Sequence, residues 1–343
     1  MIETYRMLGE QRRADFDREA RRSHRAALVP RRRRARLGLT TAVAVALLAV
    51  LVFAQQSSAA GGDRPDILFT SDRAGNFDIW GMTDDGSNLV QLTTHRADDI
   101  FPDWSPDGSR IAFARGVRPF GTDIWVMDAD GTNQRQLTTN GVGDMGPAWS
   151  PDGKRIAFVR VSPTPFGPDF DLYVMNADGT GERELTSGPA FETGPGWSPD
   201  GKKILFTSDR SGAGTLALYT IRPNGTGLEK LTADSLDTFV PAWSPDGNRI
   251  ATSDHATLGE SDLVVMNADG TGVTQLFETE RSESHPTWSP DGGRLAFESF
   301  ALTSNGNFAA KSGEIYSVAA DGSGMINLTN RPGATDEHPD WRP

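Results

Sequence analysis

The string Trp104-Ser105-Pro106-Asp107-Gly108 decides the fold, because it returns along the chain at a nearly constant interval. In its Ser-Pro-Asp-Gly turn, proline already has the φ that the turn needs, and glycine accepts a left-handed conformation. Successive tryptophans are separated by 45, 48, 46 and 45 residues, and a shortened copy contains Trp341, 53 residues after the fifth. The five complete copies begin at Trp104, Trp149, Trp197, Trp243 and Trp288.

Each interval contains the pattern of four short strands. The first strand is the Pro-x-Trp stretch, and the second is the apolar run after the turn, such as Arg110–Ala114. A third strand of the Asp-Ile-Trp type, Asp123–Trp125, runs into an Asp-Gly turn that makes a hairpin with the fourth, which ends in Leu137-Thr138. Four antiparallel strands per unit of about 45 residues are typical of a β-propeller.

The two ends of the repeat region complete each other. Residues 66–94 contain a second, third and fourth strand but no first, whereas residues 336–341 contain a first strand and nothing after it. Together they make one blade, which removes two sheet edges that would otherwise be exposed. The sequence therefore predicts an all-β, six-bladed propeller of four-stranded antiparallel blades over residues 63–343.

The repeated strings carry a family resemblance. The WSPDG strings, the Asn-Ala-Asp-Gly-Thr-Gly turns and Ser71–Asn76 resemble the TolB-like propeller repeat, a relative of the WD-type propellers. The resemblance covers residues 63–343 and implies a domain that binds proteins. It includes neither the α/β domain that precedes the propeller in TolB itself nor the α/β-hydrolase domain that follows the propeller in the prolyl-oligopeptidase group.

Charge divides the sequence into parts with different environments. Residues 1–36 hold 12 arginines and five acidic residues, a net charge of +7, and residues 37–62 hold no charged residue. The apolar run Leu37–Ala54 is just long enough to span a bilayer, and positive flanks stay on the cytoplasmic side. We therefore expect a cytoplasmic basic segment, a single transmembrane signal anchor at 37–54, a linker at 55–62 and an extracytoplasmic propeller.

An alternative is a cleaved signal peptide. Val52-Phe53-Ala54 fits a small-residue cleavage site, and cleavage near Ala54 would give a secreted propeller. The 36 residues before the apolar run are longer than the start of an ordinary signal peptide, which favours the uncleaved anchor. The propeller region has a net charge of −19, so we expect no nucleic-acid partner, because phosphate binding needs clustered basic residues.

One repeat position carries acidic residues in almost every unit. It lies five residues before the tryptophan, and the unit that has Thr238 there places an aspartate beside it. Because first strands are innermost, these residues should recur around one mouth of a central channel. They predict a hydrated rim, carboxylates that accept backbone hydrogen bonds, or a site for Ca²⁺ or a basic peptide. The candidates are Asp99, Asp144, Glu192, Asp237, Glu283 and Asp336.

Two histidines suggest a second kind of site. His285 and His338 both stand three residues before a repeat tryptophan, in adjacent blades, with Glu283, Asp336 and Glu337 nearby in sequence. Two imidazoles with carboxylates are able to bind a transition metal. The alternative is that both are ordinary, partly buried polar residues.

No catalytic motif accompanies the repeats. The sequence has no cysteine, no Gly-x-Ser-x-Gly, no His-Glu-x-x-His and no phosphate-binding loop. We therefore expect a membrane-anchored binding module, not an enzyme, that presents a propeller surface or its acidic channel mouth to a protein, peptide or envelope ligand, with Ca²⁺ as the one cofactor to consider. The alternative is a metal-dependent hydrolase or lyase with its site in the channel.

Overall fold

The computed structural model describes residues 64–117, 121–165, 167–213, 215–257, 260–303, 309 and 312–343. The expected cytoplasmic segment, anchor and linker lie outside these ranges. Among the residues described, no helix has the length and apolar character to cross a membrane.

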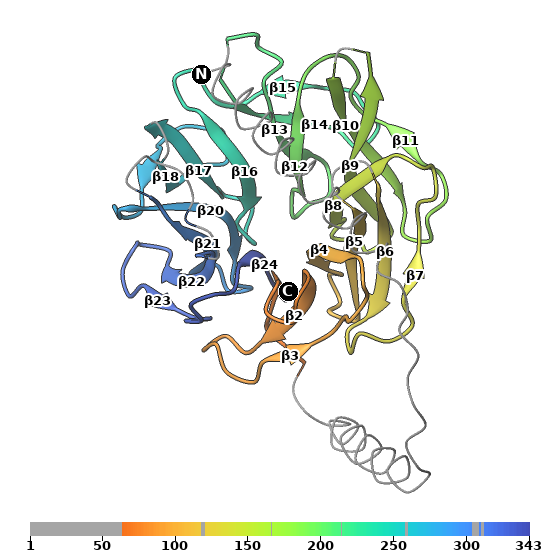
Figure 1. The fold of residues 1–343 in the computed structure, drawn as a ribbon. Helices are drawn as coiled ribbons and strands as arrows, with labels where there is room; N and C mark the ends of the chain where they lie inside the picture. Colours follow the sequence, from red (N-terminus) through yellow and green to blue (C-terminus); the bar gives the residue numbers. More distant parts are fainter. Residues whose placement is uncertain are drawn as a thin grey trace, which may run out of the picture. The chain divides into compact units, whose positions relative to one another are not determined.

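The described residues form six four-stranded antiparallel sheets arranged as blades around an axis (Figure 1). The predicted six-bladed, all-β propeller is thereby confirmed. From the innermost strand outward, blade 1 contains β24 (Asp336–Trp341), β1 (Ile67–Ser71), β2 (Asp78–Met82) and β3 (Val90–Gln91), and blade 2 contains β4 (Asp98–Trp104), β5 (Arg110–Val117), β6 (Gly121–Asp128) and β7 (Arg135–Gln136). In the same order, blade 3 contains β8 (Gly143–Trp149), β9 (Arg155–Thr164), β10 (Gly167–Asn176) and β11 (Arg183–Glu184), and blade 4 contains β12 (Glu192–Trp197), β13 (Ile204–Ser208), β14 (Ala217–Ile221) and β15 (Glu229–Lys230). Blade 5 contains β16 (Thr238–Trp243), β17 (Arg249–Thr257), β18 (Glu260–Asn267) and β19 (Thr274–Gln275), and blade 6 contains β20 (Arg281–Trp288), β21 (Arg294–Ala301), β22 (Glu314–Ala319) and β23 (Ile326–Asn327).

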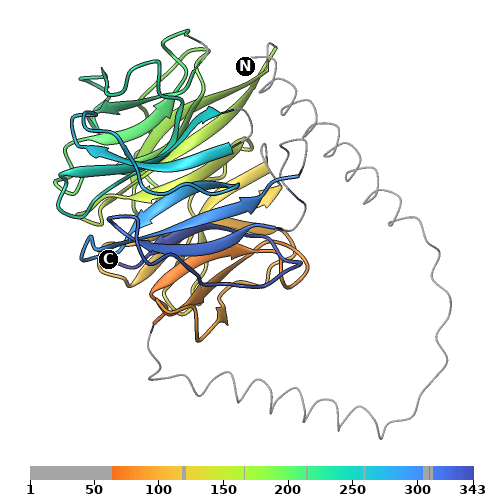
Figure 2. The same ribbon diagram turned by 90° about the vertical axis from the view of Figure 1, so that its left-hand side faces the viewer.

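Blade 1 is assembled from both ends of the propeller region. Strand β24 pairs with β1 so that Trp341 lies opposite Ile67 and Asp336 opposite Ser71. Figure 2 shows the dark blue C-terminal strand beside the orange strands of blade 1. An ion pair between Arg342 and Asp66, at 2.8 Å, lies just beyond this pairing. The ring is therefore closed by hydrogen bonds between residues far apart in sequence.

The core lies between the blades. The repeat tryptophan of one blade packs on the sheet of the preceding one: Trp104 of blade 2 joins Leu68 and Ile79 of blade 1 in one buried cluster. The phenylalanine of the second strand is fully buried in five blades. Each blade packs one face on the preceding blade and the other face on the following blade. The buried apolar second strands therefore hold the innermost strands and their side chains in fixed positions.

The acid of the Ser-Pro-Asp-Gly turn is used locally. Asp107 accepts hydrogen bonds from the Ser105 hydroxyl at 2.7 Å and from the Ser109 backbone N–H at 3.0 Å, and these bonds lower the pKa of Asp107 to about 2. Gly108 has a φ of 60°, a conformation that glycine adopts without strain. The recurrence of this acid is explained by turn formation.

Candidate functional site

The acids predicted to line a channel mouth are buried. Asp99, for example, is 0% exposed and accepts two hydrogen bonds from Arg115, Nε to Oδ1 at 2.6 Å and Nη2 to Oδ2 at 2.7 Å. In four blades an arginine from the adjacent strand of the same blade, or from the turn after it, binds the carboxylate. The pairs are Asp99–Arg115, Asp144–Arg160, Glu192–Arg210 and Asp336–Arg73.

These arginines are themselves held in place. The Arg115 guanidinium lies 4.7 Å from the ring centroid of Trp125, and that of Arg160 lies 4.4 Å from the centroid of Tyr173. A bidentate pair between a buried carboxylate and a stacked guanidinium neutralises both charges. The four acids are therefore buried ion pairs within blades and not a hydrated rim, and a ligand role for them stays a prediction.

The other two predicted rim acids have neutral partners. Glu283 is 1% exposed and accepts hydrogen bonds from Thr279 Oγ1 at 2.7 Å and Ser299 Oγ at 3.2 Å, and burial raises its pKa. Asp237 accepts the backbone N–H of Leu216 at 2.7 Å, while the neighbouring Thr238 occupies the position equivalent to the other acids. These two acids also serve the local fold.

Every innermost strand has a bulge three residues before its tryptophan. At this point the register with the second strand shifts, as between Ile100 and Asp103 in blade 2. Bulges redirect a side chain and often lie beside functional sites. The residues at the bulge all have positive φ, between 48° and 60°: Phe101, Gly146, Gly194, Val240, His285 and His338.

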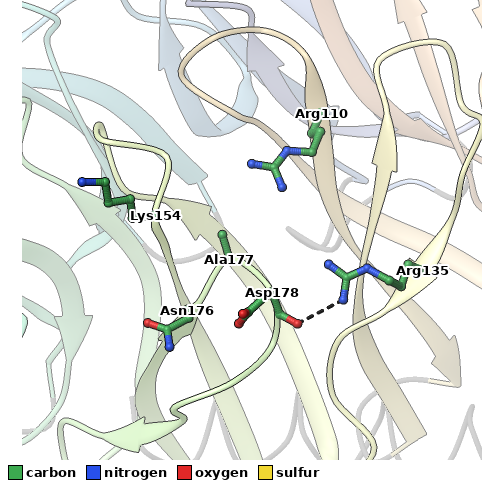
Figure 3. A pocket seen from close by; sticks show the side chains of 6 residues that line it. All are labelled: Arg110, Arg135, Lys154, Asn176, Ala177 and Asp178. Atoms are coloured by element: carbon green, nitrogen blue, oxygen red, sulfur yellow. Dashed lines mark hydrogen bonds between the residues drawn. The ribbon is translucent and has the colours of Figure 1, made fainter.

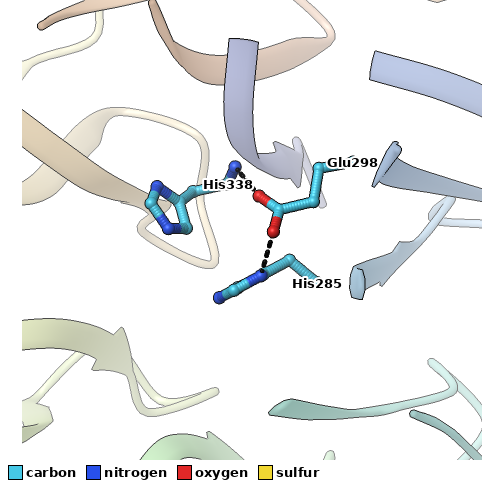
Figure 4. Close-up of side chains that lie close together, drawn as sticks. All are labelled: His285, Glu298 and His338. Carbon is cyan, nitrogen blue, oxygen red and sulfur yellow. Dashed lines mark hydrogen bonds and ion pairs between the residues drawn. The ribbon is translucent and has the colours of Figure 1, made fainter. Parts of the chain in front are cut away.

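In blades 6 and 1 this bulge places two histidines and a glutamate together (Figure 4). The rings of His285 and His338 lie with centroids 4.6 Å apart at 84°. Glu298, on β21, is 4% exposed; its Oε1 lies 2.7 Å from His285 Nδ1, and its Oε2 accepts the backbone N–H of His338 at 2.9 Å. One donor atom from each of the three side chains lies within 4.8 Å of the others.

The electrostatics of this cluster follow from burial and charge pairing. Burial alone raises the pKa of Glu298, but the attraction and hydrogen bond of His285 outweigh it and hold that pKa well below its usual range. Burial likewise lowers the pKa of His285, and Glu298 outweighs that effect, so the pKa of His285 is raised. Each group therefore favours the charged form of the other, on the inner side of the ring.

The repeat positions of His285 and His338 predicted that the two histidines lie close together, and the structure confirms this, but the repeat positions did not predict the carboxylate that joins them. The partner is Glu298, whereas Glu283 and Asp336 bind elsewhere and Glu337 lies 3.7 Å from His338 Nδ1. A signal was present in the repeat, because the other units have small or apolar residues at the position of Glu298: Thr70, Ala114, Val159, Thr207 and Ser253.

Two more carboxylates lie on the innermost strands, each directly before the repeat tryptophan of its blade. Asp340 of blade 1 accepts a hydrogen bond from the backbone N–H of Trp104 in blade 2, at 2.7 Å. Asp103 of blade 2 accepts one from the backbone N–H of Trp149 in blade 3, at 2.6 Å. Burial raises the pKa of Asp340 to about 7, and burial together with the Asp340 carboxylate raises that of Asp103 well above its usual range. These carboxylates connect blades 1, 2 and 3.

A basic pocket lies between blades 2 and 3, where the sequence analysis proposed no site (Figure 3). It has a volume of about 280 Å³. Arg110 is held over the Trp149 ring at 4.6 Å, and Arg135 donates a hydrogen bond to the backbone carbonyl of Asp178 at 3.0 Å. Its lining contains three cationic side chains and one carboxylate: Arg110, Arg135, Lys154, Asn176, Ala177 and Asp178.

Comparisons with solved structures agree with this architecture. TolB from Acinetobacter baumannii superimposes with a TM-score of 0.66 at 21% sequence identity, over 86% of this chain and 71% of that one. A putative TolB from Agrobacterium tumefaciens gives 0.60 at 19% identity, over 82% of this chain and all of that one. The chain has the TolB-like propeller fold.

More distant structures share the same ring. An oligogalacturonate lyase in complex with manganese gives a TM-score of 0.53 at 14% identity, over 76% of this chain and 73% of that one. No protein-family model matches the sequence, and no curated protein matches it. At these identities the likeness establishes the fold alone, so function has to be argued from the residues of this chain.

Proposed function

We propose that this protein is a membrane-tethered binding module. Its propeller lies outside the cytoplasm and binds an acidic segment of a protein partner. The TolB-like fold supports a binding scaffold in general terms. The basic segment at 1–36, followed by the apolar run at 37–54, supports the tether and its orientation. The recurring acids are used for turns and ion pairs, which leaves the basic side chains between blades as candidates for ligand contacts.

The basic pocket is the observation that carries this proposal. A domain with a net charge of −19 gathers three cations at one hollow, two of them fixed by Trp149 and by the carbonyl of Asp178. Fixed guanidinium groups bind carboxylates with little loss of conformational freedom. A volume of about 280 Å³ accommodates one or two acidic side chains or a peptide's terminal carboxylate.

The binding claim is tested with a fluorescein-labelled, glutamate-rich peptide and the purified full-length protein, followed by fluorescence anisotropy. We expect binding that weakens as salt rises and that falls at least about tenfold in an Arg135→Glu, Lys154→Glu variant. Lys202→Glu is the matched control, because Lys202 is 80% exposed and lies outside the pocket. Equal affinity of the pocket variant and the wild type would refute the assignment.

The topology is tested separately. In intact cells, we expect protease to reach the propeller from outside and the protein to stay in the membrane fraction. A mature soluble protein that begins near Gln55 would refute the anchor and leave export alone.

A metal-dependent lyase or hydrolase is the second candidate, and the cluster of His285, Glu298 and His338 favours it. Three protein ligands would leave a coordination position open to water or substrate, as in catalytic metal centres. Incubation with uronate oligosaccharides and Mn²⁺ tests the lyase version, because cleavage by elimination creates an unsaturated product that absorbs ultraviolet light. Absence of that product would remove this lyase activity.

A further inference from the structure

The cluster formed by His285, Glu298 and His338 contains more than the fold of this ring requires. Blades 4 and 5 are bridged by Thr207, whose hydroxyl oxygen accepts the Val240 backbone N–H at 3.1 Å. Glu298 makes the equivalent bridge between blades 6 and 1. Because a neutral hydroxyl suffices for this bridge, its presence does not explain a buried carboxylate with two adjacent imidazoles.

We propose that His285, Glu298 and His338 bind one divalent transition-metal ion, with Zn²⁺ as the preferred ion. The proposal concerns the metal site alone and holds whether the protein is a binding module or an enzyme. Imidazole nitrogen together with a carboxylate oxygen suits zinc and its first-row neighbours, whereas Ca²⁺ prefers six or more oxygen ligands.

The geometry is close to that of a metal centre. Ligand atoms about 2.0–2.2 Å from a tetrahedral zinc ion lie roughly 3.3–3.6 Å from one another. The three donor atoms already lie within 4.8 Å, so rotations that move them by about 1 Å or less complete the site. All three residues are on strands, β20, β21 and β24, which hold such a site more precisely than loops do.

The surroundings resemble those of metal ligands. Ligating carboxylates are usually held by further hydrogen bonds, and Glu298 Oε1 accepts one from Ser284 Oγ at 2.7 Å, while Oε2 accepts the His338 N–H. The side chains of His285 and His338 are 20% and 11% exposed, so an ion can reach the buried carboxylate from their side.

The test uses purified full-length protein that has been treated with a chelator and dialysed. Isothermal titration with ZnCl₂ and with CaCl₂, together with elemental analysis, measures affinity and stoichiometry. We expect one Zn²⁺ per chain, weaker binding of Ca²⁺, and a rise in Tm with Zn²⁺. Titration with Co²⁺ adds a direct readout, because its visible absorption reports nitrogen and oxygen ligands.

Substitutions assign the ligands. His285→Gln and His338→Gln should each weaken Zn²⁺ binding more than about tenfold and change the Co²⁺ spectrum. His95→Gln is the matched control, since His95 is exposed and lies outside the cluster, and it should leave both unchanged. A thermal melt without metal shows whether each variant is folded. If a histidine variant does not fold, Glu298→Gln is tested in its place, because glutamine keeps the shape of the bridge.

Two results would overturn the proposal. One is the absence of stoichiometric Zn²⁺ binding to the folded wild-type protein. The other is Zn²⁺ binding that folded His285→Gln and His338→Gln variants, or the folded Glu298→Gln variant, retain at wild-type affinity, because the ion would then be bound elsewhere in the chain.

Discussion

Two junctions of the ring, between blades 4 and 5 and between blades 6 and 1, use one structural position for different purposes. At the first, Thr207 accepts the Val240 N–H with a neutral hydroxyl. At the second, Glu298 accepts the His338 N–H with one oxygen and contacts His285 with the other. The backbone bulge is the same at both, with φ of 48° at Val240 and 53° at His338.

The comparison separates scaffold from site. A repeat fold fixes the bulge in every blade, so a change of side chain at the bulge or at the position of Glu298 alters chemistry without altering the backbone. Glutamate and histidine at adjacent blades turn a packing junction into a charged cluster. The same junction is also where the two ends of the propeller region meet, since His338 lies on β24.

The largest effect is expected from removing the strand that forms one side of the charged junction. A stop codon after Thr335 deletes β24, exposes the inner edge of β1 and leaves Arg73 without its carboxylate partner Asp336. We expect a loss of more than about 5 kcal/mol, comparable to the whole stability of many domains, and no cooperative thermal melt. A stop codon after Trp341 is the control, because β24 is kept, and it should melt nearly as the full chain does.

The second prediction compares the junctions directly. Glu298→Ala leaves the His338 N–H and the partly buried His285 without their acceptor, and we expect a loss of about 3 kcal/mol. Thr207→Ala removes one neutral acceptor, and the expected loss is about 1–2 kcal/mol. Denaturant unfolding in the presence of a chelator measures both. Equal losses would mean that the charge pair adds nothing to the bridge at the second junction.

The architecture was predictable from sequence because turn chemistry and strand periodicity repeat in every unit. The six blades follow from Trp104 and its five counterparts. The fate of the rim acids was not predictable in the same way, because Asp99 and Arg115 are 16 residues apart and only the register of β4 with β5 brings them together. Within the repeat, a side chain that departs from its counterparts, as Glu298 does, was the informative signal.

The basic pocket was not predictable from the sequence for a related reason. Arg110 and Arg135 belong to blade 2, while Lys154 and Asp178 belong to blade 3, so the pocket exists only where two blades meet. The net charge of the domain pointed to acids instead of to this local group of cations. Sequence spacing within one unit does not reveal contacts between units.

The smallest effect is expected at a buried carboxylate that lacks the imidazole partner of Glu298. Burial, then the nearby Asp169, Glu192 and Glu184, raise the pKa of Asp171 to about 7 from an ordinary value of 3.8. Its Oδ1 has no hydrogen-bond partner within the part of the chain that the structure describes. Asp171 therefore binds a proton more tightly in the folded protein than in the unfolded protein.

The sign of the pH dependence follows from this difference. Below about pH 4 both states are protonated and Asp171 costs nothing, whereas between pH 4 and 7 the unfolded state ionises first and stability falls. Asp171→Asn should therefore stabilise the protein at pH 8, by on the order of 1 kcal/mol after solvent screening, or a few degrees in Tm, and leave it nearly unchanged at pH 4. Thermal melts at both pH values measure this, with the exposed Asp269→Asn as control, since hydrogen bonds from Thr271 lower the pKa of Asp269. A variant that is stabilised equally at pH 4 and pH 8 would show that the gain comes from the new amide and not from the removal of a buried charge.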